Sequence, residues 1–248
     1  MANASKIWNY IKSHPYPVLL LIFTLWTALG VFPLVSYEND SNVVILGCEY
    51  AYTHGIVFPP VYSFSYPMQP LTVVMVVAVK YVLPFLSCMQ IYCLTTAIAG
   101  FLFLTGSIEF ARRITGATRF KALVAAILLP EMYAIAMYPN SAIFAAACFV
   151  WALVAINRNR YVLAALLMCA APLFRADVFI VFPAIFPLFI FLGKGLKKSI
   201  LLSAIFAVAV VCISLVLFWL MGASPFEMRG TYDRWNNMIS LGTKLKAI

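Results

Sequence analysis

Long apolar stretches, separated by loops that carry most of the charged residues, are the feature that most constrains this chain. Of its 248 residues 65% are hydrophobic and only 10% are charged, and the mean hydropathy is +0.98. A soluble domain of this length carries far more polar sequence. Helices are the simplest way to satisfy the backbone of such stretches in lipid. The sequence therefore predicts an all-α, polytopic membrane protein with one transmembrane domain over residues 1–248.

The apolar stretches differ in length, and about 20 residues are needed to cross a bilayer. We predict about seven spans or partial spans, together with an interfacial helix at residues 71–84, which is short and contains Lys80 as a snorkelling charge. This helix follows a first outer loop at residues 36–70, and an outer tail occupies about residues 223–248. The predicted spans are residues 18–35, 89–110, 122–138, 141–156, 161–174, 178–192 and 200–221.

The segment around Arg175 permits two interpretations. Residues 161–192 form either two short helices, whose shared tip carries Arg175 and Asp177, or one long helix with both charges at membrane depth. Two helices place 11 of the 17 basic residues on the inner side and six of the eight acidic residues on the outer side. Because basic loops face the cytoplasm, we favour two helices and a cytoplasmic amino terminus, in a multi-pass protein of a bacterial inner membrane or the endoplasmic reticulum.

The net charge and the cysteine content restrict the kinds of partner and bound metal that the sequence predicts. The formal charge of +9 does not indicate nucleic acid, because Lys and Arg in short loops set the orientation of membrane proteins, and membrane lipids are the expected surroundings. The six cysteines lie mostly within apolar stretches and include no Cys-x-x-Cys pair. They predict neither a disulfide framework nor a metal site. The residues call for no cofactor and leave a divalent metal open.

Polar residues gather on the outer side of the predicted membrane domain. Because acidic residues are costly near a bilayer, such a cluster is a functional hypothesis, although each residue alone could be a loop charge that faces water. A carboxylate here can act as general base on an acceptor hydroxyl, and a guanidinium can bind a phosphate. The candidates are Glu38, Asp40, Glu49 and His54 in the first loop, Tyr138 and Asn140 in a turn, Arg175 and Asp177 at the tip, and Glu227, Arg229, Asp233 and Arg234 in the tail.

Two further glutamates lie within apolar stretches. Glu131 follows Pro130 and is either functional or protonated and bonded to a carbonyl that this proline frees. Glu109 lies near Arg112 and Arg113 at the inner interface, and we interpret it as an ion-paired end residue.

The first loop has an ordered set of motifs. Asp40 follows the first predicted span, Gly55 lies fifteen positions later, and Pro59-Pro60 leads towards the interfacial helix. This order resembles the conserved module of the GT-C class of integral-membrane glycosyltransferases, which includes protein O-mannosyltransferases and the aminoarabinose transferase. In that class an acidic pair, a glycine, a Pro-rich segment and an interfacial helix follow the first span. Residues 103–116 are similar to the end of its second span, and the resemblance covers most of the chain.

The resemblance implies transfer of a sugar, by inverting displacement, from a polyprenyl- or dolichyl-phosphate donor to a lipid, glycan or protein acceptor on the outer or lumenal face. By position Asp40 matches the catalytic acid of the class. Ser41 departs from its second acid, for which Glu38 and Glu49 are the alternatives. The candidates for the donor phosphate are Arg175, Arg229 and Arg234. The supporting residues are His54, Glu131, Tyr138, Asn140 and Asp177.

Two other classes of protein remain open. A transporter or flippase for a lipid-linked sugar would need polar residues deep within several spans, whereas here they gather at one face apart from Glu131. A non-catalytic membrane subunit would bind a partner through the aromatic first loop. Since members of the GT-C class usually carry further spans or a soluble carboxy-terminal domain, this chain would be a minimal member or a fragment.

Overall fold

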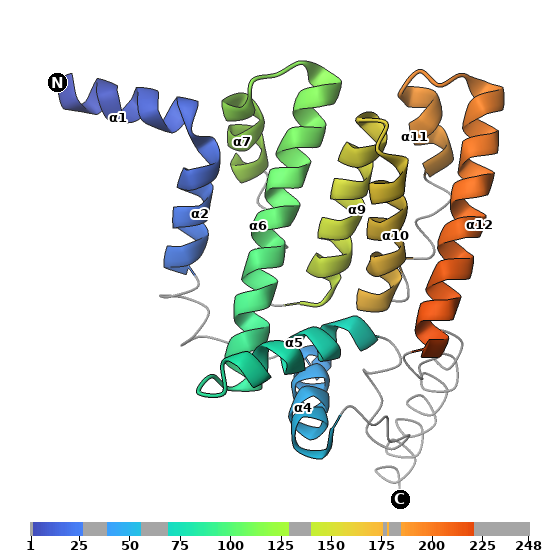
Figure 1. The fold of residues 1–248 in the computed structure, drawn as a ribbon. Coiled ribbons are helices and arrows are strands. Elements are labelled where there is room, and N and C mark those ends of the chain that lie inside the picture. The colour runs from blue at the N-terminus through green and yellow to red at the C-terminus, as the bar shows by residue number, and fades with distance from the viewer. Residues whose placement is uncertain are drawn as a thin grey trace, which may run out of the picture.

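The fold is described by a computed structural model for residues 2–26, 39–55, 69–128, 140–175, 178 and 185–220. Within these residues the regular structure is helical throughout, as the sequence predicts (Figure 1). The longer elements are α1 (Ala2–Ser13), α2 (Pro15–Trp26), α4 (Asn39–His54), α5 (Pro70–Val82), α6 (Cys88–Thr115), α7 (Arg119–Leu128), α9 (Ala142–Asn157), α10 (Tyr161–Phe174), α11 (Ile185–Phe191) and α12 (Leu196–Leu220).

The helices form a bundle with two distinct ends. α6, α9, α10 and α12 lie side by side, with α6 packed on α9, α9 on α10, and α10 on α12 (Figure 1). The turns from α6 to α7, from α9 to α10 and from α11 to α12 share one end, which we name the basic end because these turns carry Arg and Lys. At the opposite end, named the α5 end, α5 lies across the bundle and packs on α4, α6 and α10.

Two helices are long and apolar enough to cross a membrane. α6 has 28 residues and α12 has 25, and at about 1.5 Å per residue both exceed the hydrocarbon core of a bilayer, which is about 30 Å thick. Only 17% of the most apolar stretch of α12 is buried inside the protein. The core helix of a soluble protein would be mostly buried. The two helices indicate association with a membrane. α9 and α10, with 16 and 14 residues, are shorter than a full span.

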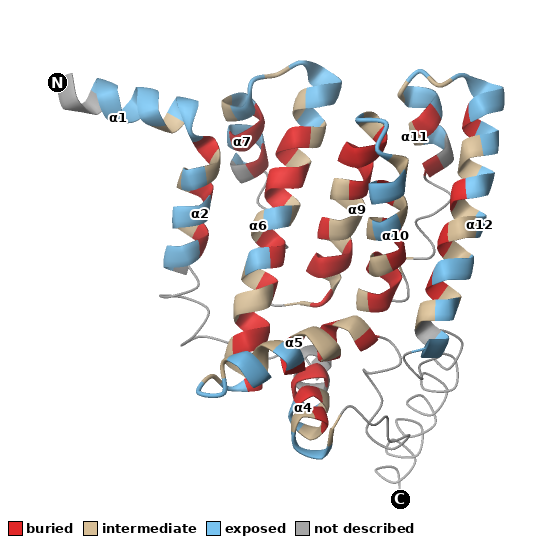
Figure 2. Ribbon diagram, viewed as in Figure 1, coloured by how far each residue is buried: buried red, intermediate tan, exposed pale blue. Residues whose placement is uncertain are grey.

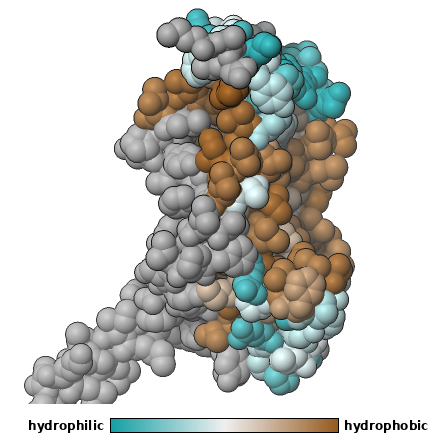
Figure 3. Space-filling model, turned by 90° about the vertical axis from the view of Figure 1, so that its left-hand side faces the viewer, coloured by the Kyte–Doolittle hydropathy of each residue, from teal (hydrophilic) through white to brown (hydrophobic). Residues whose placement is uncertain are grey.

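The surface supports the same placement. Figure 2 shows exposed positions along the outer side of α12, where large side chains such as Ile205, Val208 and Trp219 are 58%, 63% and 77% exposed. The face that carries α2 and α7 is hydrophobic across its middle and hydrophilic towards both ends in the part that is described (Figure 3). An apolar belt between two polar ends is what a bilayer requires of a protein that lies within it.

The long helix α6 has a defined start and stop, which fix where its charged end lies. At its start Ser87 and Gln90 form a capping box, in which the Gln90 N–H donates to Ser87 Oγ at 3.1 Å and the Ser87 N–H donates to Gln90 Oε1 at 2.9 Å. At its end Gly116 takes a φ of 68° and donates its N–H to the Arg112 carbonyl oxygen at 2.9 Å. The left-handed glycine turns the chain back so that α7 packs on α6.

One structural prediction for the first outer loop is wrong. Asn39–His54 is a helix, α4, and not part of a loop over residues 36–70. Val44, Cys48 and Ala51 are buried on one face, at the spacing of three and four residues that a helix requires. The helix ends at Gly55, whose φ of 83° suits a residue without a side chain. The glycine in the GT-C-like order of motifs therefore has a structural role here.

The two-helix interpretation of residues 161–192 agrees with the structure. α10 ends at Phe174, and Arg175 has an extended backbone with φ −158° and ψ 110°, so a single helix through Arg175 is excluded. The following helix, α11, is described over Ile185–Phe191 and ends next to the turn into α12. Its lysine-bearing turn lies at the basic end, as the charge distribution predicts.

The helix predicted at residues 71–84 is present as α5, which begins one residue earlier and ends two residues earlier. Lys80 does not extend away from the protein as predicted. Its Nζ donates to the carbonyl oxygens of Pro84 and Leu86 and lies 5.3 Å from the centroid of the Tyr52 ring. The ammonium thus closes the turn after α5, because that turn leaves carbonyl oxygens without helical partners.

The sequence analysis did not predict α1. This helix leaves the bundle at the basic end and lies at a steep angle to α2 (Figure 1). Ile7, Trp8 and Tyr10 are at least half exposed, and Lys6 and Lys12 lie on the same helix. Trp8 also meets Phe120 of α7 edge to face, with ring centroids 5.3 Å apart. Aromatic and basic residues combined on one short helix are typical of segments that lie in a membrane interface.

Candidate functional site

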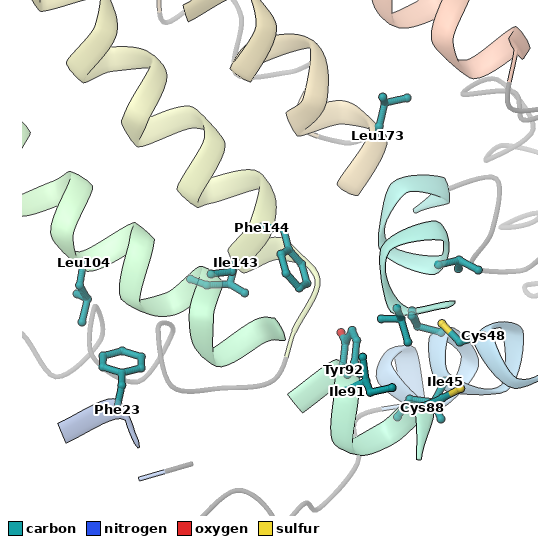
Figure 4. Close-up of a cluster of buried hydrophobic side chains, with 14 of the residues drawn as sticks. Phe23, Ile45, Cys48, Cys88, Ile91, Tyr92, Leu104, Ile143, Phe144 and Leu173 are labelled. Carbon is teal, nitrogen blue, oxygen red and sulfur yellow. The ribbon is translucent and has the colours of Figure 1, made fainter. Parts of the chain in front are cut away.

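The first candidate site lies at the α5 end. A buried apolar cluster holds the helices together there, and Figure 4 shows Ile45 and Cys48 of α4 close to Cys88, Ile91 and Tyr92 of α6. Burial raises the pKa of the Cys48 thiol, so this cysteine is protonated and inert. The packed cluster fixes α4 and α5 against the ends of α6 and α10, and any chemistry at this end must come from polar groups around it.

Arg175 and Asn140 are brought together at this end from two different helices. Arg175 directly follows α10, and its Nη1 donates to Asn140 Oδ1 at 3.4 Å. The same oxygen accepts the Ala142 N–H at 2.8 Å, which fixes the asparagine at the start of α9. Phe144 and Phe174 stack with their ring centroids 5.1 Å apart, so the two helix ends keep a constant separation. The guanidinium is therefore oriented by Asn140 at the start of α9.

Two buried polar groups at the start of α5 were not predicted. Gln69 is 7% exposed and Thr72 is fully buried, and Gln69 Oε1 and Thr72 Oγ1 have no hydrogen-bond partner among the described residues. Buried polar groups normally have partners. Because the α5 helix packs on α10, these groups belong to the same end of the bundle as Arg175. Their signal in the sequence is weak, since a glutamine before a Pro-initiated helix is common.

Glu49 and His54 lie on the exposed side of α4. His54 Nδ1 lies 2.8 Å from Thr53 Oγ1, and the ring stacks on Tyr50 at 4.2 Å between centroids. In the described part of the chain neither residue forms a hydrogen bond or an ion pair with Arg175. They belong to the same end of the bundle as Arg175, because α4 and α10 both pack on α5.

Most of the remaining predicted residues lie outside the described part of the chain. Asp40 lies in the first turn of α4. Outside the described residues are Glu38, Glu131, Tyr138, Asp177, Glu227, Arg229, Asp233 and Arg234.

The most extensive polar network of the described residues lies at the opposite, basic end, around Glu109. This carboxylate is 4% exposed and accepts hydrogen bonds from the Tyr16 hydroxyl, from Arg112 Nη2 at 3.0 Å and from Arg119 Nε at 2.8 Å. Arg158 Nη2 lies 3.8 Å from Glu109 Oε2. The bond to Glu109 raises the pKa of Arg119, so its guanidinium stays charged.

The sequence analysis identified only part of this network. The ion pair of Glu109 with Arg112 is confirmed, whereas Arg113 is exposed and forms no ion pair with Glu109 among the described residues. Arg119 could have been found from the sequence, because Gly116 reverses the chain between the two residues. Tyr16 and Arg158 could not, since they belong to helices that are distant in sequence and meet α6 only through packing.

Neither end has the residues of a metal centre within residues 2–26, 39–55, 69–128, 140–175 and 185–220. No group of three or more His, Cys, Asp or Glu residues in this part of the chain could hold a metal ion. All six cysteines are free thiols.

Comparison with known proteins adds no family. No protein-family model, curated protein or solved structure matches this chain. The fold and the two ends define its class: an all-helical protein with two helices that are long and apolar enough to cross a membrane.

Proposed function

We propose that the chain is a membrane glycosyltransferase that transfers a sugar from a polyprenyl-phosphate donor at the α5 end. The observation that carries this proposal is the position of Arg175, at the end of α10, with its guanidinium oriented by Asn140 from α9. A guanidinium is planar and carries five N–H donors, a geometry that suits the oxygens of a phosphate. The α5 helix lies across the same end, where a lipid-linked donor would enter from the bilayer.

The proposed reaction is a single displacement at the anomeric carbon of the donor sugar. The acceptor hydroxyl oxygen forms the new glycosidic bond as the bond from carbon to the phosphate oxygen breaks. Asp40 takes the hydroxyl proton as general base, with Glu38 and Glu49 as the alternatives. Arg175, with Arg229 or Arg234, stabilises the negative charge that grows on the departing polyprenyl phosphate. The reaction needs no redox partner.

The proposed topology places the basic end in the cytoplasm and the α5 end outside, or in a lumen. It has about seven spans or partial spans, with the amino terminus inside. Support comes from the arginines and lysines in the three turns at the basic end (Figure 1) and from the positive-inside rule. Single-cysteine labelling checks it in a chain freed of its own cysteines. An impermeant maleimide should modify position 197 only after lysis, and modification in intact cells would contradict the topology.

The activity is tested with the purified full chain and a radiolabelled polyprenyl-phosphate sugar. Arg175→Lys keeps the charge but loses the planar pair of donors, so donor turnover should fall more than charge alone explains. Arg160→Lys, at the basic end, is the matched control and should keep full turnover. Asp40→Asn should lower turnover by about 10²–10⁴-fold.

Three results would contradict parts of this proposal. Turnover that survives Asp40→Asn but not Glu38→Gln or Glu49→Gln would assign the base to another acid of the first loop. Turnover that is unchanged in all three variants would remove the loop from the mechanism. Normal donor affinity in an Arg175→Lys protein with lowered thermal stability would show that Arg175 is structural.

A further inference from the structure

The network around Glu109 at the basic end carries an excess of positive charge. Arg112, Arg119 and Arg158 surround one carboxylate, which leaves a net charge of +2 on the four side chains. The carboxylate is 5% exposed, whereas the guanidinium-bearing side chains are 33%, 53% and 35% exposed. Glu109 is therefore the buried part of the network, and the arginines form its solvent-accessible side.

The hydrogen bonds of the network are also incomplete. A guanidinium has five N–H donors, so three of them offer far more donors than one carboxylate can accept. Arg112 Nε is buried and has no partner in the described structure. Arg158 Nη2, at 3.8 Å from Glu109 Oε2, is beyond hydrogen-bond distance and interacts with the carboxylate only through charge. A buried donor without a partner is costly, and an anion with several oxygens would supply the missing acceptors.

The location of the network restricts the source of that anion. Arg112 is in the last turn of α6, Arg119 begins α7, and Arg158 follows α9. All three therefore belong to the basic end, at the helix ends and turns that border the apolar bundle. The α1 helix, with Trp8 against Phe120 of α7, lies at the same end and has the composition of an interfacial helix. A ligand at this depth is reached from the headgroup layer.

We infer that Arg112, Arg119 and Arg158 form a binding site for the phosphate of an anionic phospholipid headgroup at the basic end. A phosphate matches the planar donor pairs of arginine and brings the negative charge that the network lacks. Basic pockets between helices at a membrane interface bind anionic headgroups by the same chemistry. The inference requires only that the chain lies in a membrane, and it does not depend on glycosyl transfer at the other end.

The experiment uses the delipidated full chain in a neutral detergent. Native mass spectrometry measures binding of phosphatidylglycerol, and phosphatidylcholine, whose headgroup has no net charge, is the comparison lipid. Phosphatidylglycerol should bind more tightly. Inorganic phosphate is added in a separate arm: if it displaces the lipid at equal concentration, the source of the ligand is free phosphate, and if it does not, the source is the lipid. Equal binding of both lipids would overturn the inference.

Arg158→Gln is the decisive variant, because this arginine forms no hydrogen bond to Glu109 and its loss leaves the other bonds of the network in place. It should weaken phosphatidylglycerol binding by about tenfold, the factor that one hydrogen bond between charged groups contributes. Arg113→Gln removes the same charge from an exposed residue at the same end of α6, one that forms no ion pair with Glu109 among the described residues, and is the matched control. Equal weakening by both variants would reduce the site to a diffuse positive surface and overturn the inference.

Glu109→Gln gives a second, independent readout. Without the carboxylate three guanidinium groups face each other, so a bound phosphate should replace it as the acceptor. Phosphatidylglycerol should then raise the melting temperature of Glu109→Gln by more than it raises that of the unmodified chain. A smaller rise would overturn the inference. If Glu109→Gln does not fold, Arg158→Gln against Arg113→Gln decides the question alone.

Discussion

The two ends of the bundle hold their polar residues in different ways. At the basic end one buried carboxylate, Glu109, gathers partners from α2, from the end of α6, from α7 and from the turn after α9. At the α5 end Asn140 Oδ1 accepts a hydrogen bond of 3.4 Å from Arg175 Nη1. The first arrangement joins several helices through one buried carboxylate, whereas the second joins the start of α9 to the residue after α10 through an amide and a guanidinium.

This contrast teaches that a count of acidic residues is a poor guide to where a chain concentrates its interactions. The sequence predicts most of the acidic residues on the outer side, but Glu49, one of them, lies on the exposed face of α4. Glu109 was interpreted as a helix-end residue and is nearly inaccessible. Burial, not number, decides how strongly a charge acts on its surroundings.

The largest expected effect on stability is that of Glu109→Ala. Removal of this carboxylate leaves three arginines to repel one another and the Tyr16 hydroxyl without its acceptor, so the free energy of unfolding should fall by about 3 kcal/mol. This is the lower end of the usual range, because the arginines are partly exposed. Thermal unfolding in detergent measures it. Glu49→Ala, an exposed acid of the α5 end, is the control and should change stability by no more than about 0.5 kcal/mol; similar losses in both would remove the contrast between the ends.

Gly106→Ala should have the next largest effect on stability. It acts on the contact between α6 and α9, two helices that run between the two ends of the bundle (Figure 1). A Cβ at position 106 would lie 2.5 Å from Val150 Cγ1 and 3.0 Å from Trp151 Nε1. Neither neighbour can move easily, because valine is β-branched and the Trp151 indole donates to the Leu102 carbonyl oxygen at 2.8 Å. Overpacking costs about 1–3 kcal/mol, and the better helix propensity of alanine offsets up to about 1 kcal/mol of this.

A double-mutant cycle checks this explanation of Gly106→Ala. Val150→Ala removes the methyl group that the new Cβ would meet. The double variant should therefore lose less stability than the sum of the two single variants. Strictly additive losses would show that the two positions do not touch, and that the packing of α6 on α9 differs from the structure.

Tyr16→Phe should destabilise the protein by about 1.5 kcal/mol, the lower value for a hydrogen bond to a charged group. It removes only the hydroxyl that α2 donates to Glu109. The α2 helix should loosen at the basic end while the rest of the bundle stays folded, and hydrogen exchange of the α2 amides measures this. Tyr10→Phe, in the exposed α1 helix, is the matched control. If hydrogen exchange in α2 is unchanged, apolar contacts such as that of Phe23 with Phe101 keep this helix in place.

The smallest expected effect is that of Asn140→Ala at the α5 end, at about 1 kcal/mol. The variant loses the side-chain oxygen that accepts the Ala142 N–H in the first turn of α9, which is a capping interaction. Asn140→Asp keeps an acceptor there and adds a charge beside Arg175, so its stability should be at least that of the unmodified chain. Thermal unfolding measures both. If Asn140→Asp is as unstable as Asn140→Ala, the oxygen at this position is not a helix cap.

Part of the fold follows from the sequence because local chemistry determines it. α10 has the predicted bounds, because its apolar stretch ends at the charged residue Arg175, where the backbone becomes extended. α5 was predicted as a helix from its length and its single lysine. α4 was missed because the mixture of Asn, Ser, Tyr and His around its short apolar stripe reads as a loop, and only burial against α5 makes the helix favourable.

The sequence by itself determined that the chain is helical and that basic turns share one end. It predicted about seven spans or partial spans, and the structure shows two helices, α6 and α12, that are long and apolar enough to cross a membrane. These properties depend on composition and on spacing along the chain, which each segment carries with it. Only the tertiary structure decided that Glu109 meets Tyr16 and Arg158, and that Arg175 meets Asn140. Those contacts join helices far apart in sequence, and their geometry depends on how side chains pack between helices, which no periodicity of a single segment specifies.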